Sequence, residues 1–205
     1  LPFPPQALLS GYRGRVGAKL EYVRSFTLPE GFWSSGKGKR GRVLLHFGAV
    51  DQVAEVFLNG RFVGRHEGGY LPFWFDVTEY LADDEKGENL LCVKAEDTLS
   101  ARYPYGKQRK ARGGMWYTPV SGIWQSVWLE PVPDSYIERL DVTADTRKVR
   151  IAVARGGGKR TGEAAQRFVG SEKAACADRA PNNAAESLSV TIKLQDGSFH
   201  TVRTQ

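Results

Sequence analysis

Cysteine, histidine and long apolar runs are all scarce in this sequence of 205 residues. The two cysteines, Cys92 and Cys176, form neither a metal-binding spacing nor a disulfide framework. The three histidines, His46, His66 and His200, are isolated from one another, so the sequence gives no support for a metal site. No apolar run approaches the roughly 18 residues that a membrane-spanning helix needs. We therefore expect no metal, no cofactor and no membrane partner.

Signatures of catalysis are also missing. A serine nucleophile often lies in a Gly-x-Ser-x-Gly turn, and the sequence has none. Hydrolysis of a glycoside usually needs two carboxylates roughly 5–10 Å apart, and the acidic residues offer no convincing pair. Asp83-Asp84-Glu85 is typical of a solvated polar loop, and Gly156-Gly157-Gly158 lacks the strand–loop–helix context of a phosphate-binding loop. We expect no catalytic residue in this chain.

The composition, which is 41% hydrophobic and 11% aromatic, is sufficient for a packed core and excludes disorder over the whole chain. At about 150 residues per domain, the length indicates between one and two domains. The aromatic residues are unevenly placed, because after Tyr136 only Phe168 and Phe199 remain. The chain begins with Leu1 rather than methionine, which suggests an incomplete N-terminus and leaves the localisation unknown.

The first part of the chain has the pattern of short strands. Asn59-Gly60 predicts a hairpin, because both positions of such a turn need a positive φ. His46 lies in an apolar stretch and is expected to be a packed histidine. A short helical turn is expected near Val77–Leu81, capped by Asp76 or Thr78. Strands with turn signals between them and no long helical pattern favour a β-sandwich. The expected strands are 43–47, 54–58, 61–64, 89–95 and 123–129.

The second part of the chain begins at Pro131-Val132-Pro133, where two prolines are expected to end the strand ladder. Beyond this boundary the pattern predicts about four strands, too few for an immunoglobulin-like sandwich of roughly seven. Such an incomplete sheet has open edges, so residues 134–205 are expected to be mobile or prone to associate. The expected strands are 136–143, 148–154, 189–194 and 199–203, and residues 155–186 are expected to form a loop or disordered insert.

Two aromatic clusters are candidate sugar platforms, because sugars present apolar C–H faces with a hydroxyl rim. The alternative, which we favour for any single ring, is that these rings fill the space between two sheets. Trp124 and Trp128 fit that alternative, whereas Trp116 and Tyr117 lie beside Gly113-Gly114 and are better candidates for an exposed loop. The first cluster comprises Tyr70, Phe73, Trp74 and Phe75, and the second Trp116, Tyr117, Trp124 and Trp128.

A basic run at residues 102–112 interleaves arginine and lysine with tyrosine, which is the composition of a groove for single-stranded nucleic acid. A solvated loop that orders against a partner domain is the alternative that we favour. Residues 46–100 carry a net charge of −7, which partly cancels the +5 of residues 101–118. We therefore expect no nucleic-acid partner.

The run from Phe47 to Gly60, followed by the run from Val63 to Phe73, resembles the N-terminal sugar-binding domain of family 2 glycoside hydrolases. These enzymes include β-galactosidases, β-glucuronidases and β-mannosidases. A second signature, from Trp116 to Leu129, is similar to the strand that closes that domain, and the opening Pro2-Phe3-Pro4-Pro5 resembles a segment near the start of these enzymes. The resemblance covers residues 1–133.

The resemblance implies an all-β chain, with a jelly-roll (galactose-binding-like) β-sandwich over 1–133 and a partial immunoglobulin-like β-sandwich over 134–205. In the family a catalytic barrel follows and holds two glutamates, the acid/base one directly after an asparagine. No asparagine of this chain precedes a glutamate. Galactosidases of the family also carry an aspartate just before a Met-Trp pair, whereas here Gly114 precedes Met115-Trp116.

We therefore expect the non-catalytic N-terminal part of a β-galactosidase-like enzyme, with a β-galactoside or related glycoside and the catalytic barrel as its partners. The loop at 102–117 would form part of the wall of the substrate cleft, and Arg102, Gln108, Trp116 and Tyr117 are its candidate substrate-binding residues. The alternatives are a free-standing carbohydrate-binding module and, third, a nucleic-acid-binding chain.

Overall fold

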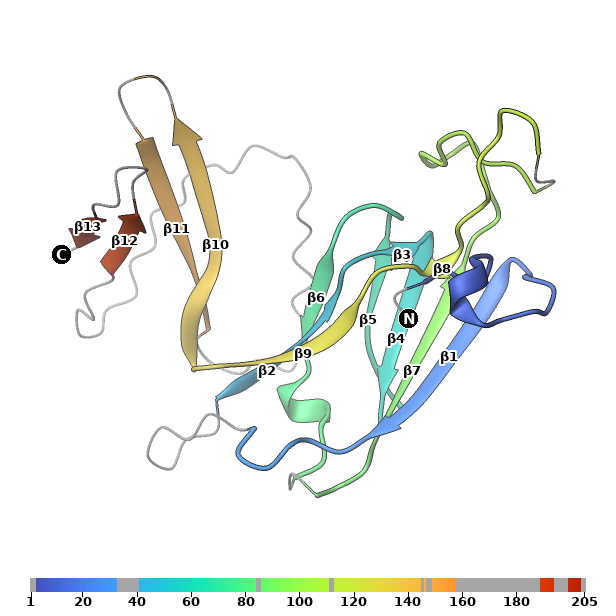
Figure 1. Cartoon of the computed structure of the whole chain (residues 1–205). Coiled ribbons are helices and arrows are strands. Elements are labelled where there is room, and N and C mark those ends of the chain that lie inside the picture. The colour runs from blue at the N-terminus through green and yellow to red at the C-terminus, as the bar shows by residue number, and fades with distance from the viewer. Residues whose placement is uncertain are drawn as a thin grey trace. The chain divides into compact units, whose positions relative to one another are not determined.

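The computed structural model describes residues 3–32, 41–83, 86–110, 113–144, 146 and 149–157, and the strands Ser189–Lys193 and Phe199–Arg203. Residue contacts divide the chain into two units, Leu1–Val169 and Gly170–Gln205. In both units the described strands pair antiparallel (Figure 1). The expectation of an all-β fold is confirmed.

The larger sheet of the first unit has four strands in the order β1-β7-β4-β5. Along β4 and β7 the side chains alternate between buried and more exposed positions, because successive residues of a strand point to opposite faces. One face of this sheet therefore lies in the core and the other faces outward. The strands are β1 (Lys19–Phe26), β4 (Val53–Leu58), β5 (Arg61–Glu67) and β7 (Asn89–Glu96).

A three-stranded sheet with the order β6-β2-β9 forms the other layer. β3 pairs with β8 in a ladder of two residues. In the chain, β3 lies between β2 and β4, and β8 directly precedes β9. The strands are β2 (Arg42–Phe47), β3 (Val50–Asp51), β6 (Phe73–Asp76), β8 (Gly122–Ile123) and β9 (Val127–Val132).

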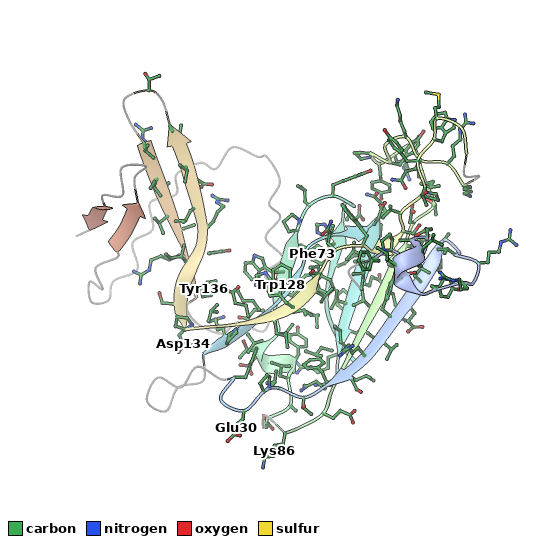
Figure 2. All side chains as sticks on the ribbon, viewed as in Figure 1. Glu30, Phe73, Lys86, Trp128, Asp134 and Tyr136 are labelled. Carbon is green, nitrogen blue, oxygen red and sulfur yellow. The ribbon has the colours of Figure 1, made fainter. Side chains whose placement is uncertain are left out.

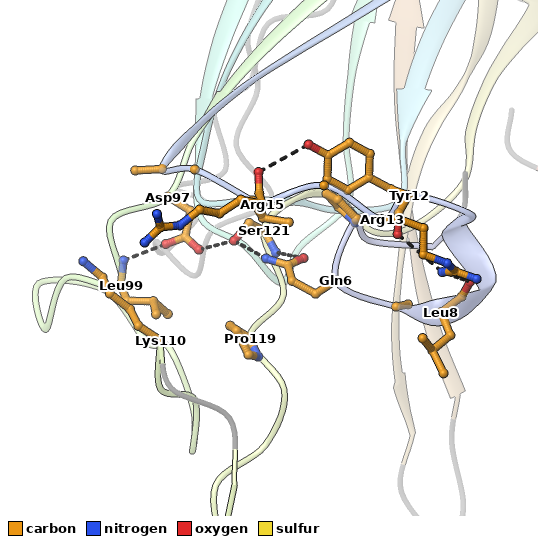
Figure 3. A pocket seen from close by; sticks show the side chains of 16 residues that line it. Gln6, Leu8, Tyr12, Arg13, Arg15, Asp97, Leu99, Lys110, Pro119 and Ser121 are labelled. Atoms are coloured by element: carbon orange, nitrogen blue, oxygen red, sulfur yellow. Dashed lines mark hydrogen bonds between the residues drawn. The ribbon is translucent and has the colours of Figure 1, made fainter.

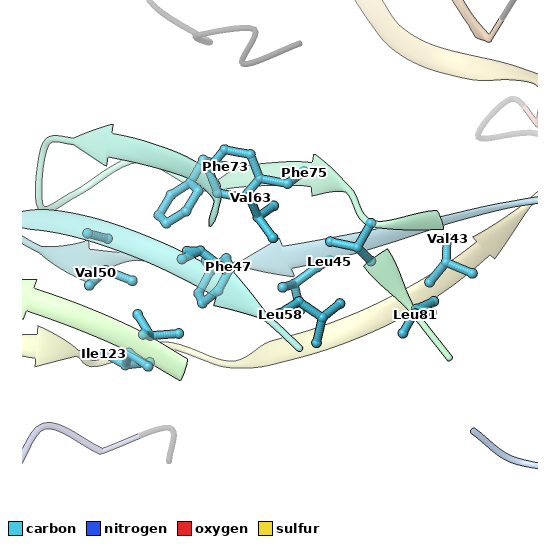
Figure 4. Packing of buried hydrophobic residues seen from close by; sticks show 14 of the residues in the cluster. Val43, Leu45, Phe47, Val50, Leu58, Val63, Phe73, Phe75, Leu81 and Ile123 are labelled. Carbon is cyan, nitrogen blue, oxygen red and sulfur yellow. The ribbon is translucent and has the colours of Figure 1, made fainter. Parts of the chain in front are cut away.

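The core lies between these two sheets, and both contribute to one cluster of buried apolar side chains (Figure 4). The three-stranded layer contributes the buried side chains of Phe47 from β2 and Phe75 from β6. The four-stranded layer contributes those of Val56 from β4 and Val93 from β7. Fully burying side chains of this size contributes roughly 1.5–3 kcal/mol each. This face-to-face packing is the β-sandwich that the sequence predicts.

The Asn59-Gly60 turn joins β4 to β5, and both residues have positive φ, 53° and 77°. The predicted hairpin is confirmed. Asn59 does more than turn the chain: its Nδ2 donates to the Tyr80 carbonyl at 2.8 Å and to Asn89 Oδ1 at 2.9 Å. Its Oδ1 accepts the Leu90 N–H at 2.8 Å. One side chain thus ties the hairpin to β7 and to the loop ahead of it.

The predicted helical turn is also present, as the 3-10 turn η2 (Thr78–Tyr80). The expected cap is wrong, because the N-cap residue is Val77 and no side-chain capping bond is made. Asp76, one residue earlier, instead accepts the Thr78 N–H with its Oδ1 at 3.0 Å. The other described helix is the turn η1 (Leu8–Ser10). Within the described parts of the chain, neither helix is long and apolar enough to cross a membrane.

The structure corrects two expectations about the closing strand. Residues 123–129 do not form one strand, because the chain changes partners between β8 and β9. Between them the backbone N–H of Trp124 donates to the Ala49 carbonyl. Pro131 does not end the ladder, since it lies within β9 opposite Val43. An edge strand tolerates a proline, and β9 lies at the edge of its sheet.

Beyond residue 133, β10 (Ser135–Ala144) pairs with β11 (Val149–Gly157), and β12 (Ser189–Lys193) pairs with β13 (Phe199–Arg203). All four expected strands are therefore present. Residues 155–157, expected to begin the insert, extend β11 instead. Residues 158–186 lie outside the described part of the chain. The domain boundary at 133/134 stays a prediction.

Replacing Asn59 tests the turn and its network separately. Asn59→Gly keeps the left-handed backbone but loses three hydrogen bonds, including those to the Tyr80 carbonyl and from the Leu90 N–H, at a cost of about 2 kcal/mol. Asn59→Ala adds the strain of a positive φ, about 1 kcal/mol more. The free energy of unfolding from denaturant titration checks both values. Equal stability of the wild type and Asn59→Gly would contradict the network.

Candidate functional site

Three segments far apart in sequence meet at one end of the sandwich: the N-terminal segment, the corner after β5, and the long loop after β7. The pairing of β4 with β7 sets this arrangement, because Val53 at the start of β4 lies opposite Glu96 at the end of β7. Residues just before β4 and just after β7 are therefore neighbours. These residues are Asp51 and Asp97.

Asp51 and Asp97 are both buried, with 4% and 9% of their surface exposed. Burial, and then the nearby Asp97 carboxylate, raises the pKa of Asp51 to about 7. The expectation that no pair of carboxylates is arranged for glycoside hydrolysis stays a prediction. Asp97 accepts hydrogen bonds at both oxygens, from the Leu99 N–H and the Ser121 hydroxyl, each at 2.8 Å. Asp97 thus anchors the loop.

The corner after β5 closes directly over Asp51. A Cβ at Gly69 would collide with the Asp51 carboxylate, so only glycine fits there. Trp124 Nε1–H donates to the Gly69 carbonyl at 2.8 Å, and the Trp124 ring meets Tyr70 edge to face at 6.4 Å. Trp124 therefore braces the corner. Burial, followed by the charge of Asp51, raises the pKa of the Tyr70 hydroxyl.

Gln108 connects the long loop to this corner. Its side chain lies near enough to the Tyr70 hydroxyl to lower the pKa of that group in part, against the effect of burial. Its Oε1 accepts the Val120 N–H at 2.6 Å. Next to it, the Tyr117 N–H donates to the Lys107 carbonyl at 2.8 Å. The two ends of the loop are thus clamped together, and the tip is left exposed, with Met115 at 68%.

The four candidate residues from the sequence take different positions in this loop. Tyr117 is 66% exposed and forms a β-bridge with Gln108, so the structure brings these two together. Trp116 is half-buried and stacks under the Arg109 guanidinium, 3.9 Å from the ring centre. Arg102 is exposed, and among the described residues no hydrogen bond or ring contact joins it to the other three.

Sequence reasoning missed Asp51, Asp97 and the residues that hold them. Gln6 is the clearest case, because its amide pairs with Ser121 across 115 positions: Nε2 donates to the Ser121 hydroxyl at 2.8 Å, and Oε1 accepts the Ser121 N–H at 3.3 Å. The signal that could have found the two aspartates is the strand register. Aligning the predicted strands at 54–58 and 89–95 antiparallel brings their flanking residues together.

A cavity of about 700 Å³ opens beside Asp97, between the N-terminal segment and the long loop (Figure 3). Gln6, Asp97 and Ser121 supply polar groups to its lining, and Arg13, Arg15 and Lys110 supply positive charge. Leu8, Leu99 and Pro119 line it with apolar surface. Polar groups beside apolar walls are suited to a hydroxylated ligand.

The outer face of the three-stranded sheet carries an exposed tryptophan. Trp128 on β9 is 46% exposed and stacks on His46 of β2, with ring centres 4.9 Å apart (Figure 2 labels Trp128). His46 Nε2 lies 2.8 Å from Glu130 Oε2, while burial lowers the His46 pKa more than Glu130 raises it. His46 is therefore packed and Trp128 is a sheet-face residue, as the sequence predicts.

Within the described ranges, no group of three or more histidine, cysteine, aspartate or glutamate side chains is placed to hold a metal ion.

Residues 13–133 match the sequence profile of the sugar binding domain of glycosyl hydrolases family 2. The chain belongs to this family. It is 34% identical over 132 residues to a β-galactosidase of Thermoanaerobacter pseudethanolicus, covering 64% of this chain and 16% of that enzyme. It is 29% identical over 116 residues to a β-glucuronidase of Formosa agariphila, covering 57% of this chain and 11% of that enzyme.

Solved structures of the family give the same result for the fold. A β-glucuronidase from an uncultured Clostridium species superposes with a TM-score of 0.51 at 31% identity, covering 68% of this chain and 24% of that one. The Bifidobacterium dentium β-glucuronidase superposes with a TM-score of 0.51 at 26% identity, covering 68% of this chain and 28% of that one. This family 2 chain thus spans only a small share of its relatives, and the matched part is their non-catalytic sugar-binding domain.

The raised pKa of Asp51 predicts a pH-dependent stability. Its pKa is higher in the folded chain than in the unfolded one, so the folded state loses stability as pH rises from about 4 through about 7. Three pKa units correspond to at most about 4 kcal/mol. Asp51→Asn stays neutral and should remove this loss. His46 and His66 have lowered pKa values, so their effect is that stability increases as pH rises. This effect is the same in the wild type and in Asp51→Asn, so it cancels when the two are compared.

The measurement is the free energy of unfolding at several pH values for the wild type and Asp51→Asn. The wild type should lose stability relative to the variant as pH rises. If the difference in unfolding free energy between the two proteins did not change with pH, the raised pKa of the buried Asp51 would be contradicted.

Proposed function

We propose that this chain acts as the non-catalytic N-terminal part of a β-galactosidase-like family 2 glycoside hydrolase, bracing a catalytic barrel and walling part of its substrate cleft. The observation that carries the proposal is the match of residues 13–133 to the family's sugar-binding domain. The substrate is a β-galactoside or a related glycoside. Residues 134–205 belong to an immunoglobulin-like domain that leads toward the barrel.

The geometry of the long loop supports its role at the cleft. Its base is clamped by Gln108 and Asp97, so the tip is presented on a fixed support. Tyr117, at the clamp next to the tip, exposes its ring, and an aromatic ring beside polar and charged groups is a common platform for a sugar. Trp116, held under Arg109, forms the inner side of this platform. Arg102 contributes charge at the rim.

Assays of the chain alone test the proposal. We expect no hydrolysis of nitrophenyl β-galactoside or nitrophenyl β-glucuronide, because a retaining mechanism needs two carboxylates across the scissile bond and we assign both to the barrel. We also expect calorimetric titration with the same sugars to give no binding at millimolar ligand, since half of the cleft would be missing. Continuation of the reading frame past Gln205 into a barrel would complete the test.

Two results would contradict the proposal. Hydrolysis by the purified chain would place catalysis within it. Binding at micromolar to low millimolar ligand, abolished by Tyr117→Ala but retained by Tyr117→Phe, would instead identify a free-standing carbohydrate-binding module that uses the ring as its platform. The Phe variant serves as the matched control, because it keeps the ring and removes only the hydroxyl.

A further inference from the structure

The outer face of the four-stranded sheet is exposed and partly apolar. Val23 on β1 is 60% exposed, Phe62 on β5 is 54% exposed and Leu90 on β7 is 48% exposed. All three belong to the four-stranded sheet, and the other face of this sheet packs in the core. A contiguous apolar patch on a sheet face is typical of an interaction surface.

The strand register arranges this face in rows that cross all four strands. Val23, Cys92, Phe57 and Phe62 lie opposite one another in turn along the order β1-β7-β4-β5. Phe57 and Phe62 contact edge to face, with ring centres 5.4 Å apart. We call these four residues the apolar row.

The next row along the strands is charged throughout. Glu21 lies opposite Lys94, Lys94 opposite Glu55, and Glu55 opposite Arg65. The charges therefore alternate, negative, positive, negative, positive, in the order β1-β7-β4-β5. We call these four residues the charged row. Read from the opposite edge of the sheet, the same row is positive, negative, positive, negative.

This alternation makes the face complementary to itself, and we propose that it binds a second copy of this chain. The twofold axis would lie in the interface, parallel to the strands and midway between β7 and β4. This operation reverses the order of the strands and keeps the position along them. Glu21 would then face Arg65 of the second copy, and Lys94 would face Glu55.

The neighbouring rows agree with the same axis. Val23 would face Phe62 of the second copy, and Cys92 would face Phe57, so apolar groups meet apolar groups. In the row beyond the charged one, Lys19 and Glu67 occupy the two edges and would also face each other, whereas Glu96 and Val53 between them form a mixed pair. A hollow of about 470 Å³ over the charged row leaves room for the side chains of the second copy.

The size of the face sets the expected affinity. Four strands about 4.8 Å apart, with β1 and β7 eight residues long, give a patch roughly 19 Å by 26 Å. A patch of this size is at the small end of specific interfaces, so we expect a dissociation constant in the micromolar range. This inference concerns a different surface from the loop end and stands apart from the proposed function.

Sedimentation velocity of the full 205-residue chain and its charge variants tests the proposal. The wild type should pass from monomer to dimer between about 1 and 200 µM. Glu55→Lys sets Lys94 against a lysine, and Lys94→Glu sets Glu55 against a glutamate, each twice per dimer. Either variant alone should therefore dimerise at least about 100-fold more weakly.

Mixing the two variants provides the decisive arm. In the mixed pair both contacts are between opposite charges. The lysine introduced by Glu55→Lys faces the glutamate introduced by Lys94→Glu. At the other contact, the unchanged Lys94 of the first variant faces the unchanged Glu55 of the second. A heterodimer should therefore form. Repulsion within one sheet could destabilise each variant, but it cannot produce this rescue on mixing. Glu30→Lys and Lys86→Glu, exposed positions outside the sheet that are labelled in Figure 2, are matched controls and should dimerise as the wild type does.

Three results would overturn the proposal. The first is a monomeric wild type over the whole concentration range. The second is a wild-type dimer that Glu55→Lys leaves intact, which would place the interface elsewhere. The third is the absence of a heterodimer from two variants whose circular dichroism spectra show a native fold.

Discussion

The antiparallel pairing of β4 with β7 is the constraint on which the rest of the structure depends. These are the two central strands of the larger sheet, and Val56 lies opposite Val93 on the core side. Because side chains alternate along a strand, a slip of one residue would turn Val56 outward and Glu55 into the core. Burial of the valines, and the cost of burying a carboxylate, therefore fix one register.

That register has consequences on each side of the sheet. On the inner face it aligns the side chains that pack against Phe47 and Phe75 of the opposite layer. At the end of the strands it brings Asp51 next to Asp97, which organises the loops at the candidate site. On the outer face it sets the charged and apolar rows across four strands. Core, loop end and outer surface thus share one origin.

Local signals in the sequence predicted local structure well. The Asn59-Gly60 hairpin and the short turn after Asp76 follow from backbone preferences of a few adjacent residues. Features that depend on distant partners were not predictable in the same way. Pro131 is tolerated because β9 is an edge strand, and the Asp51–Asp97 pair exists only once β4 and β7 are in register. Both require the topology rather than the neighbouring sequence.

The β4–β7 register can be measured directly by disulfide trapping in a Cys92→Ser, Cys176→Ser background. Glu55 and Lys94 are paired across the two strands, where Cα atoms lie about 4.5–5.5 Å apart, within reach of a disulfide. Glu55→Cys with Lys94→Cys should form an intramolecular disulfide under mild oxidation, identified by peptide mass in the band that migrates as a monomer on non-reducing electrophoresis. Glu55→Cys with Val93→Cys, on opposite faces, should not. The reverse outcome would contradict the register and everything built on it.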